Sequence, residues 1–130
     1  MSTGIIVDTC VWIEFFRRPE SDLTVHLKGL LRERKVTMVG MVLAEILQGI
    51  KVQKEARLVK ESLKKLPYLE MTRDIWEQAG KISAVLRKKG TTIPLSELII
   101  ASLALSSGYE VFTIDTHFEE VKGLNLYNFP

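Results

Sequence analysis

The sequence predicts an α/β protein in which helices cover both faces of a mostly parallel sheet. Short runs of β-branched and other apolar residues alternate along the chain with longer segments whose apolar residues recur at helical spacing. This alternation is typical of strand–helix–strand units, which build parallel sheets. No linker, internal repeat or low-complexity stretch interrupts it, so residues 1–130 are expected to form one domain around a sheet of four to five strands.

The first half of the chain contains three predicted strands. Residues 4–7 form a continuous apolar run, the pattern of a strand buried on both faces. Ser21 can cap a helix whose leucines recur at helical spacing, and a second strand follows at residues 36–39. Residues 41–66 are predicted to be helical in two pieces, and residues 67–71 to form a short strand.

The second half begins with a helix that has both of its end signals. Thr72 provides the cap, and Gly90 follows the last turn as a stop. Pro94 opens another helix, which runs to the Ser-Gly pair at 107–108. A strand is expected at residues 109–114, and residues 125–127 can add an edge strand.

The composition excludes several other classes of protein. Among the 130 residues, 46% are hydrophobic and 26% charged, which is ordinary for a globular protein and unlike a disordered or collagen-like chain. No apolar run approaches the roughly 18 residues of a membrane span, so we expect a cytoplasmic protein without a membrane partner. The single cysteine, Cys10, cannot form an internal disulfide, and no Cys/His cluster has zinc spacing.

The formal net charge of +2 hides a separation of charge along the chain. Residues 1–50 carry six basic and six acidic side chains, residues 51–90 carry 11 and 5, and residues 91–130 carry 1 and 5. The segment sums are therefore 0, +6 and −4. A basic middle and an acidic end predict two surfaces of opposite sign, although solvated helix faces produce the same pattern.

Four carboxylates are expected at one edge of the sheet. Asp8 and Asp115 each follow a predicted strand, and ligands of open parallel sheets gather at the carboxyl ends of strands. Glu45 follows the second strand by about one helical turn, and Glu97 lies in the first turn of the helix opened by Pro94. With no Lys or Arg beside them in sequence, a divalent cation is the natural neutralising partner. Oxygen-only ligands favour Mg²⁺ or Mn²⁺, which can promote hydrolysis of a phosphodiester.

The local sequences around these acids are more specific than their spacing. They comprise Ile6-Val7-Asp8-Thr9, Ala44-Glu45, residues 93–101 (IPLSELIIA) and residues 113–118 (TIDTHF). In order and interval they resemble the signature of PIN-domain ribonucleases, and most closely the VapC-type toxins of prokaryotic toxin–antitoxin pairs. The resemblance covers nearly the whole chain.

This resemblance implies an α/β/α sandwich that cleaves RNA, often a tRNA or rRNA, with Mg²⁺ or Mn²⁺. It further implies inhibition by a cognate antitoxin and the homodimer usual in the family. Carried over by position, Asp8, Glu97 and Asp115 would be metal ligands, and Glu45 would bind the metal or position the attacking water. All four are thus the expected catalytic residues.

Glu97 departs from the family pattern, which usually has aspartate at this position. The added methylene can move a carboxylate oxygen by about 1 Å, enough in some sites to cost roughly 10²-fold in rate. The alternative function is therefore a PIN-like module that binds RNA or a protein partner without cleaving it. A signalling receiver is disfavoured, because such domains have paired acids near the first strand, whereas Asp8 follows three apolar residues.

Several other residues have two interpretations each. Thr9 and Thr113 flank the acids and can orient a water at the metal, although strand-end threonines more often bond to backbone. Lys51, Lys54, Arg87 and Lys88 represent the basic middle segment, which can hold RNA phosphates.

The remaining polar and aromatic residues are expected to be structural. Cys10 lacks a basic partner and is expected to be a small buried residue rather than a nucleophile. His117, two residues after Asp115, is expected to serve local turn chemistry. The aromatic residues at 12, 15 and 16 are expected to pack in the core, with any exposed members available to an antitoxin helix or a second subunit.

Overall fold

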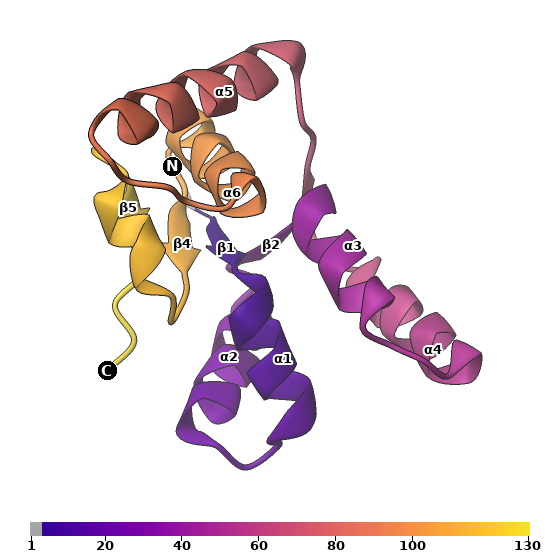
Figure 1. Cartoon of the computed structure of the whole chain (residues 1–130). Helices are drawn as coiled ribbons and strands as arrows, with labels where there is room; N and C mark the ends of the chain where they lie inside the picture. Colours follow the sequence, from indigo (N-terminus) through magenta and orange to yellow (C-terminus); the bar gives the residue numbers. More distant parts are fainter. Residues whose placement is uncertain (1–3) are drawn as a thin grey trace.

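A computed structural model of the protein describes residues 4–130, in which five parallel strands form one sheet in the order β3-β2-β1-β4-β5 (Figure 1). The central strand β1 (Ile5–Val7) lies between β2 (Val36–Val39) and β4 (Glu110–Phe112). The edges are formed by β3 (Tyr68–Leu69), beside β2, and β5 (Asn125–Leu126), beside β4. The predicted mostly parallel sheet of four to five strands is confirmed.

Helices cover the sheet on both sides, as an α/β/α sandwich requires. In chain order they are α1 (Thr9–Arg17), α2 (Asp22–Arg32), α3 (Gly40–Gln48), α4 (Gln53–Leu63), α5 (Arg73–Lys88), α6 (Leu95–Ser107) and the short 3₁₀ helix η1 (Thr116–Glu120). Helices α1 and α2 pack together on one side of the sheet, and α5 and α6 pack together on the other (Figure 1). Helix α3 contacts both α1 and α6, so it connects the two layers at the carboxyl end of β2. No helix of residues 4–130 is long and apolar enough to cross a membrane.

Burial explains why the sequences of β1, β2 and α6 are continuous or nearly continuous apolar runs. Every residue of β1 and β2 is buried, because helices lie on both faces of these strands. Helix α6 is buried along seven consecutive residues, from Leu98 to Ala104, so it has no polar face in its middle. It lies between the sheet and α5, with contacts to β4 and to α3. The core therefore continues to the start of α6, where Glu97 lies.

One helix was absent from the sequence analysis. No element was assigned to the segment between Asp8 and Ser21, yet α1 occupies most of it. Asp8 caps this helix through its side chain, and Val11 and Trp12 are its buried residues. Apolar residues at 11, 12, 15 and 16 have helical spacing, and this spacing is the sequence signal for α1.

The strand predicted at 109–114 is too long. Strand β4 ends at Phe112, and residues 113–115 leave the sheet to enter η1. This early exit has a local cause, since the Thr113 hydroxyl accepts a hydrogen bond from the backbone N–H of Asp115, at 2.9 Å. Asp115 in turn accepts one from the backbone N–H of His117, also at 2.9 Å. Side chains thus replace the ladder partners that a longer strand would have had.

Replacing Gly108 with alanine is expected to destabilise the protein by about 1–2 kcal/mol. Gly108 ends α6 with φ of +74°, in the left-handed region where a Cβ is disfavoured. Gly80→Ala is the matched control, because Gly80 lies inside α5 and a Cβ there meets nothing within 4 Å. The control is expected to stabilise by about 0.5–1 kcal/mol. Urea denaturation followed by circular dichroism measures both, and equal effects of the two substitutions would contradict this account.

Candidate active site

The four predicted acids come from four different elements at the carboxyl end of the sheet. Asp8 follows β1 and caps α1, and Asp115 follows β4 and caps η1. Glu97 lies in the first turn of α6, and Glu45 lies in α3, the helix that follows β2. The backbone N–H of Asp8 donates to the carbonyl of Phe112 at 2.9 Å, so the ends of β1 and β4 are held side by side.

Asp8 is a buried carboxylate whose hydrogen bonds come from uncharged donors. It is 5% exposed. Its Oδ1 accepts from the backbone N–H of Thr9 at 2.9 Å, and its Oδ2 accepts from the hydroxyl of Thr113 at 2.8 Å and from the Cys10 thiol at 3.3 Å. A buried carboxylate needs such donors, but neutral groups leave its charge uncompensated.

Two threonines connect Asp8 to other acids of the site. The Thr9 hydroxyl donates to Oε1 of Glu45 at 2.7 Å, and the backbone of the same residue is bonded to Asp8. The Thr113 hydroxyl donates to Asp8 and accepts from the backbone of Asp115. Both threonines, which the sequence analysis placed beside the metal site, therefore contact its acids directly.

Glu97, Asp115 and His117 form a tight group at the start of α6. One ligand atom from each lies within 4.8 Å of the others. Nδ1 of His117 is 2.6 Å from Oε1 of Glu97 and 3.1 Å from Oδ1 of Asp115. The Glu97 side chain is 14% exposed and that of His117 is 48% exposed. Asp8 and Glu45 lie outside this group of three and are connected to it through the threonines.

The surroundings of this group shift two pKa values. Burial raises the pKa of Glu97 above its usual range, the hydrogen bond from His117 opposes the shift, and Asp115 adds to it. The hydrogen bond to Glu97 and the negative charge of that residue raise the pKa of His117. Because the carboxylates of Glu97 and Asp115 are held close together, it is unfavourable for both to be charged without a cation.

The donor set of the site fits a divalent cation. Within residues 4–130, no Lys or Arg forms a salt bridge with any of the four acids; the Lys and Arg pairs of the described chain all lie elsewhere. Carboxylate oxygens are the preferred ligands of Mg²⁺ and Mn²⁺. The group that the structure brings together also contains an imidazole nitrogen, that of His117, which was not among the expected ligands.

His117 is the site residue that the sequence analysis missed. The expected turn chemistry is present, since the backbone N–H of His117 donates to Asp115. Its ring, however, contacts a carboxylate 20 residues away in sequence. The available signal was its position two residues after an acid that caps a turn, but local sequence contains nothing about the distant Glu97.

Cys10 is half-buried beside Asp8, rather than fully buried as the sequence predicts. Burial and the neighbouring charge of Asp8 raise the pKa of the thiol to about 11, so the reactive thiolate is scarce at neutral pH. Its sulfur lies 3.6 Å from the hydroxyl of Thr113. The thiol therefore belongs to the donors that surround Asp8.

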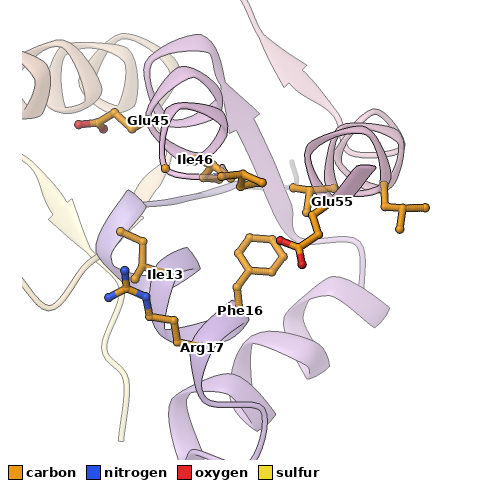
Figure 2. A pocket seen from close by; sticks show the side chains of 10 residues that line it. Ile13, Phe16, Arg17, Glu45, Ile46 and Glu55 are labelled. Carbon is orange, nitrogen blue, oxygen red and sulfur yellow. The ribbon is translucent and has the colours of Figure 1, made fainter. Parts of the chain in front are cut away.

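A groove of about 430 Å³ adjoins the site. Its walls come from α1, α3, α4 and the loop between the last two, and its lining includes Glu45 (Figure 2). Ile13 and Phe16 of α1 contribute exposed apolar surface, being 40% and 42% exposed. Arg17 and Glu55 provide charges of opposite sign within the same groove. The aromatic cluster of α1 is therefore divided, with Trp12 in the core and Phe16 at the groove.

The basic residues proposed for phosphate contacts do not share one surface. Lys54 lies in the first turn of α4 and Lys51 just before that helix, next in sequence to the groove-lining residues Glu55 and Ile50. Arg87 and Lys88 lie in the last turn of α5, and α4 and α5 occupy separate parts of the molecule (Figure 1). The structure therefore separates the two halves of the basic middle segment.

The fold and the site together define an α/β protein with an acidic candidate metal centre at the carboxyl end of a parallel sheet. The family model of the PIN domain matches residues 5–124, and the chain belongs to the PIN domain family. It is 27% identical over 121 residues to Ribonuclease VapC11 of Mycobacterium tuberculosis and equally to VapC ribonuclease Mb1587 of Mycobacterium bovis, with 90% of each chain covered.

Solved structures with the same fold come from toxin–antitoxin complexes. VapBC2 from Rickettsia felis, bound to a promoter DNA fragment, has a TM-score of 0.83 at 20% identity, covering 98% of this chain and 100% of that one. DNA-bound VapBC from Salmonella typhimurium has a TM-score of 0.79 at 22% identity, covering 96% and 97%. At this level of identity the likeness establishes the fold, and the expected PIN-type sandwich is confirmed.

Proposed function

We propose that the protein is a metal-dependent endoribonuclease toxin of a type II toxin–antitoxin pair. The observation that carries the proposal is the set of four acids connected by side-chain contacts at one edge of the sheet, none of which forms a salt bridge with a Lys or Arg among residues 4–130. Membership of the PIN domain family and the similarity to proteins named VapC ribonucleases support the same reaction.

In this mechanism Asp8, Glu97 and Asp115 would hold Mg²⁺ or Mn²⁺. A divalent cation, when bound, supplies activation of water and stabilises charge that develops on the phosphodiester oxygens. Glu45 would share in binding it or orient the attacking water, and the Thr9 hydroxyl restrains Glu45 by its hydrogen bond to Oε1. Burial of Asp8 keeps bulk water away from one side of the site.

The partners follow from the surfaces around the site. RNA, of the tRNA or rRNA type, is the proposed substrate, and Lys51 and Lys54, next in sequence to groove-lining residues, are the proposed phosphate contacts. A cognate antitoxin is the proposed inhibitor: its apolar segment would cover Ile13 and Phe16 in the groove and so approach Glu45. The similarity to chains from VapBC complexes supports this partner, and a homodimer remains a proposal from the family resemblance.

The test is metal-dependent cleavage of RNA by the purified full chain. Treatment with EDTA is expected to abolish cleavage of total tRNA or rRNA, and added Mg²⁺ or Mn²⁺ is expected to restore it, since none of the four acids forms a salt bridge with a Lys or Arg among residues 4–130. Induced expression is expected to arrest growth. A protein that cleaves equally well in EDTA, or that cleaves no RNA with either metal, would contradict the proposal.

A binding module without cleavage is the second candidate, favoured by glutamate at position 97. Replacing Glu97 with aspartate discriminates between the two functions. If wild type is inactive and Glu97→Asp creates activity, the binding function is correct. If both proteins cleave with similar metal dependence, it is wrong.

Thr113→Val is expected to lower the cleavage rate by about 10–100-fold. Valine has the shape of threonine but can neither donate to Asp8 nor accept from the backbone of Asp115, and loss of such supporting hydrogen bonds costs this much in metal sites. Thr113→Ser keeps the hydroxyl and is expected to stay within a few-fold of wild type. Initial rates at saturating Mn²⁺ measure both, and a valine variant as fast as the serine variant would remove Thr113 from the mechanism.

A further inference from the structure

The contact between His117 and Glu97 joins two features that the proposed mechanism leaves unexplained. One is the glutamate at a position where aspartate is usual. The other is an imidazole in the middle of an acidic site. Nδ1 of His117 lies 2.6 Å from Oε1 and 3.3 Å from Oε2 of Glu97, so the ring faces both carboxylate oxygens. An ionised Glu97 carboxylate only accepts hydrogen bonds, so with Glu97 ionised we assign the ring proton to Nδ1, which then donates.

We propose that His117 is a positioning residue that holds the carboxylate of Glu97 beside Asp115 in the candidate metal centre, compensating for the extra methylene of glutamate. The inference rests on the proposed metal site and concerns the glutamate that this chain has where the family usually has aspartate. Among residues 4–130, His117 is the side chain that donates a hydrogen bond to Glu97. Without it, the longer side chain has an additional torsion to order before it can bind a cation.

The position of His117 itself is fixed from both sides. Asp115 caps η1 and accepts a hydrogen bond from the backbone N–H of His117. Thr113 accepts from the backbone of Asp115 and donates to Asp8, which ties the turn to the end of β1. On the other side, Phe118 is buried and anchors η1 in the core. The ring is therefore carried by a rigid support, although the side chain is half exposed.

The same contacts complete the connection among the acids. Thr9 connects Asp8 to Glu45, and Thr113 connects Asp8 to the turn that carries Asp115. His117 connects that turn to Glu97 on α6. Supporting groups of this kind orient metal ligands and typically affect metal affinity by about 10–100-fold. His117 is thus placed to do for Glu97 what the threonines do for Asp8 and Glu45.

The experiment measures metal affinity rather than cleavage. Mn²⁺ is titrated calorimetrically into the full chain as wild type, His117→Ala, His117→Asn and His117→Gln. The amide nitrogen of asparagine can occupy the place of Nδ1, whereas that of glutamine occupies the place of Nε2. We expect His117→Ala to weaken Mn²⁺ binding by about 10–100-fold and His117→Asn to restore most of the affinity. Thr116→Ala, an exposed substitution on the same turn, is the control and is expected to bind as wild type.

A double-mutant cycle with Glu97→Asp tests the compensation. The shorter aspartate withdraws from the imidazole, so His117→Ala is expected to change Mn²⁺ affinity by less than about 3-fold in the Glu97→Asp background. An equal loss in both backgrounds would overturn the inference, as would unchanged affinity of His117→Ala. Rescue by glutamine but not asparagine would show instead that Nε2 acts directly. Circular dichroism and urea midpoints confirm that every variant is folded.

The two proposals fail in different ways. If wild type binds Mn²⁺ but cleaves no RNA, the proposed nuclease function is wrong while the titrations still decide the role of His117. If wild type cleaves RNA and His117→Ala binds Mn²⁺ normally, only the role of His117 is wrong. If wild type binds no divalent cation, the inference falls, and cleavage in EDTA decides the function separately.

Discussion

Asp8→Asn is expected to reduce RNA cleavage by more than about 100-fold while leaving the fold intact. Asn preserves the shape and can still cap α1, because Asn and Asp are equivalent N-caps. It removes the negative charge of Asp8, the most buried of the four acids, which binds the cation in the proposed mechanism. The loss exceeds that expected for the supporting threonines because Asp8 is itself a proposed ligand.

Three measurements separate loss of the site from loss of the fold. Cleavage rates at saturating Mn²⁺ give the activity, and urea denaturation without metal gives the free energy of unfolding. We expect the free energy of unfolding of Asp8→Asn to lie within about 1 kcal/mol of wild type, because the substitution removes an uncompensated buried charge without changing the shape of the side chain. The melting temperature is expected to rise with Mn²⁺ for wild type and not for the variant. Asp74→Asn, the same change at an exposed position on α5, is the control and is expected to be fully active. Cleavage by Asp8→Asn at the wild-type rate would refute the assignment of the site.

Phe112→Ala is expected to produce the largest loss of stability, about 3–5 kcal/mol. Phe112 is 0% exposed and belongs to β4, the strand that lies between β1 and β5 in the sheet. It packs against His26, Tyr127 and Phe129, with ring centroids 5.0–6.2 Å apart. Alanine removes the ring and leaves a cavity that strands hydrogen-bonded on both sides cannot close. Since domains of this size are stable by only about 5–15 kcal/mol, this is a large fraction of the total.

The expected decrease in melting temperature for Phe112→Ala is about 10–25 °C. Urea denaturation followed by circular dichroism gives the free energy of unfolding directly. Phe16→Ala is the matched control, because Phe16 is 42% exposed at the groove and loses less buried surface on truncation. We expect it to cost less than about 2 kcal/mol. If the two substitutions were equally destabilising, Phe112 would not have the central role in packing assigned to it.

Elements with complete local signals were predictable from the sequence. Helix α5 has a capping threonine, a buried apolar stripe and a terminal glycine, and the structure shows Thr72 as its N-cap and Gly90 with positive φ just beyond it. Helix α6 begins after Pro94 and ends at Gly108, as expected. Helix α1 was missed because its cap, Asp8, was considered only as a possible ligand. Asp8 caps α1 in the structure and is also a proposed metal ligand.

The four acids of the candidate site were predictable from the sequence, whereas His117 and the contacts among the side chains were not. Acids at strand ends were sufficient to select Asp8 and Asp115, because parallel strands present their carboxyl ends at one edge. The hydrogen bond from His117 to Glu97 depends on how the turn after β4 lies against the start of α6. Such a relation is set by packing over the whole core, and no local pattern encodes it. The same is true of the groove, whose walls are brought together by α1, α3 and α4.

The sequence alone therefore determined most of the strands and helices, α1 being the exception, and the four acids that lie at the edge of the sheet. Periodicity and end signals act over a few residues, and these features depend on nothing more distant. The tertiary structure alone decided the strand order, the connection of the acids through Thr9, Thr113 and His117, and the groove beside Glu45. Hydrogen bonds require atoms placed to within a few tenths of an ångström, and that precision arises only when the helices have packed on the sheet.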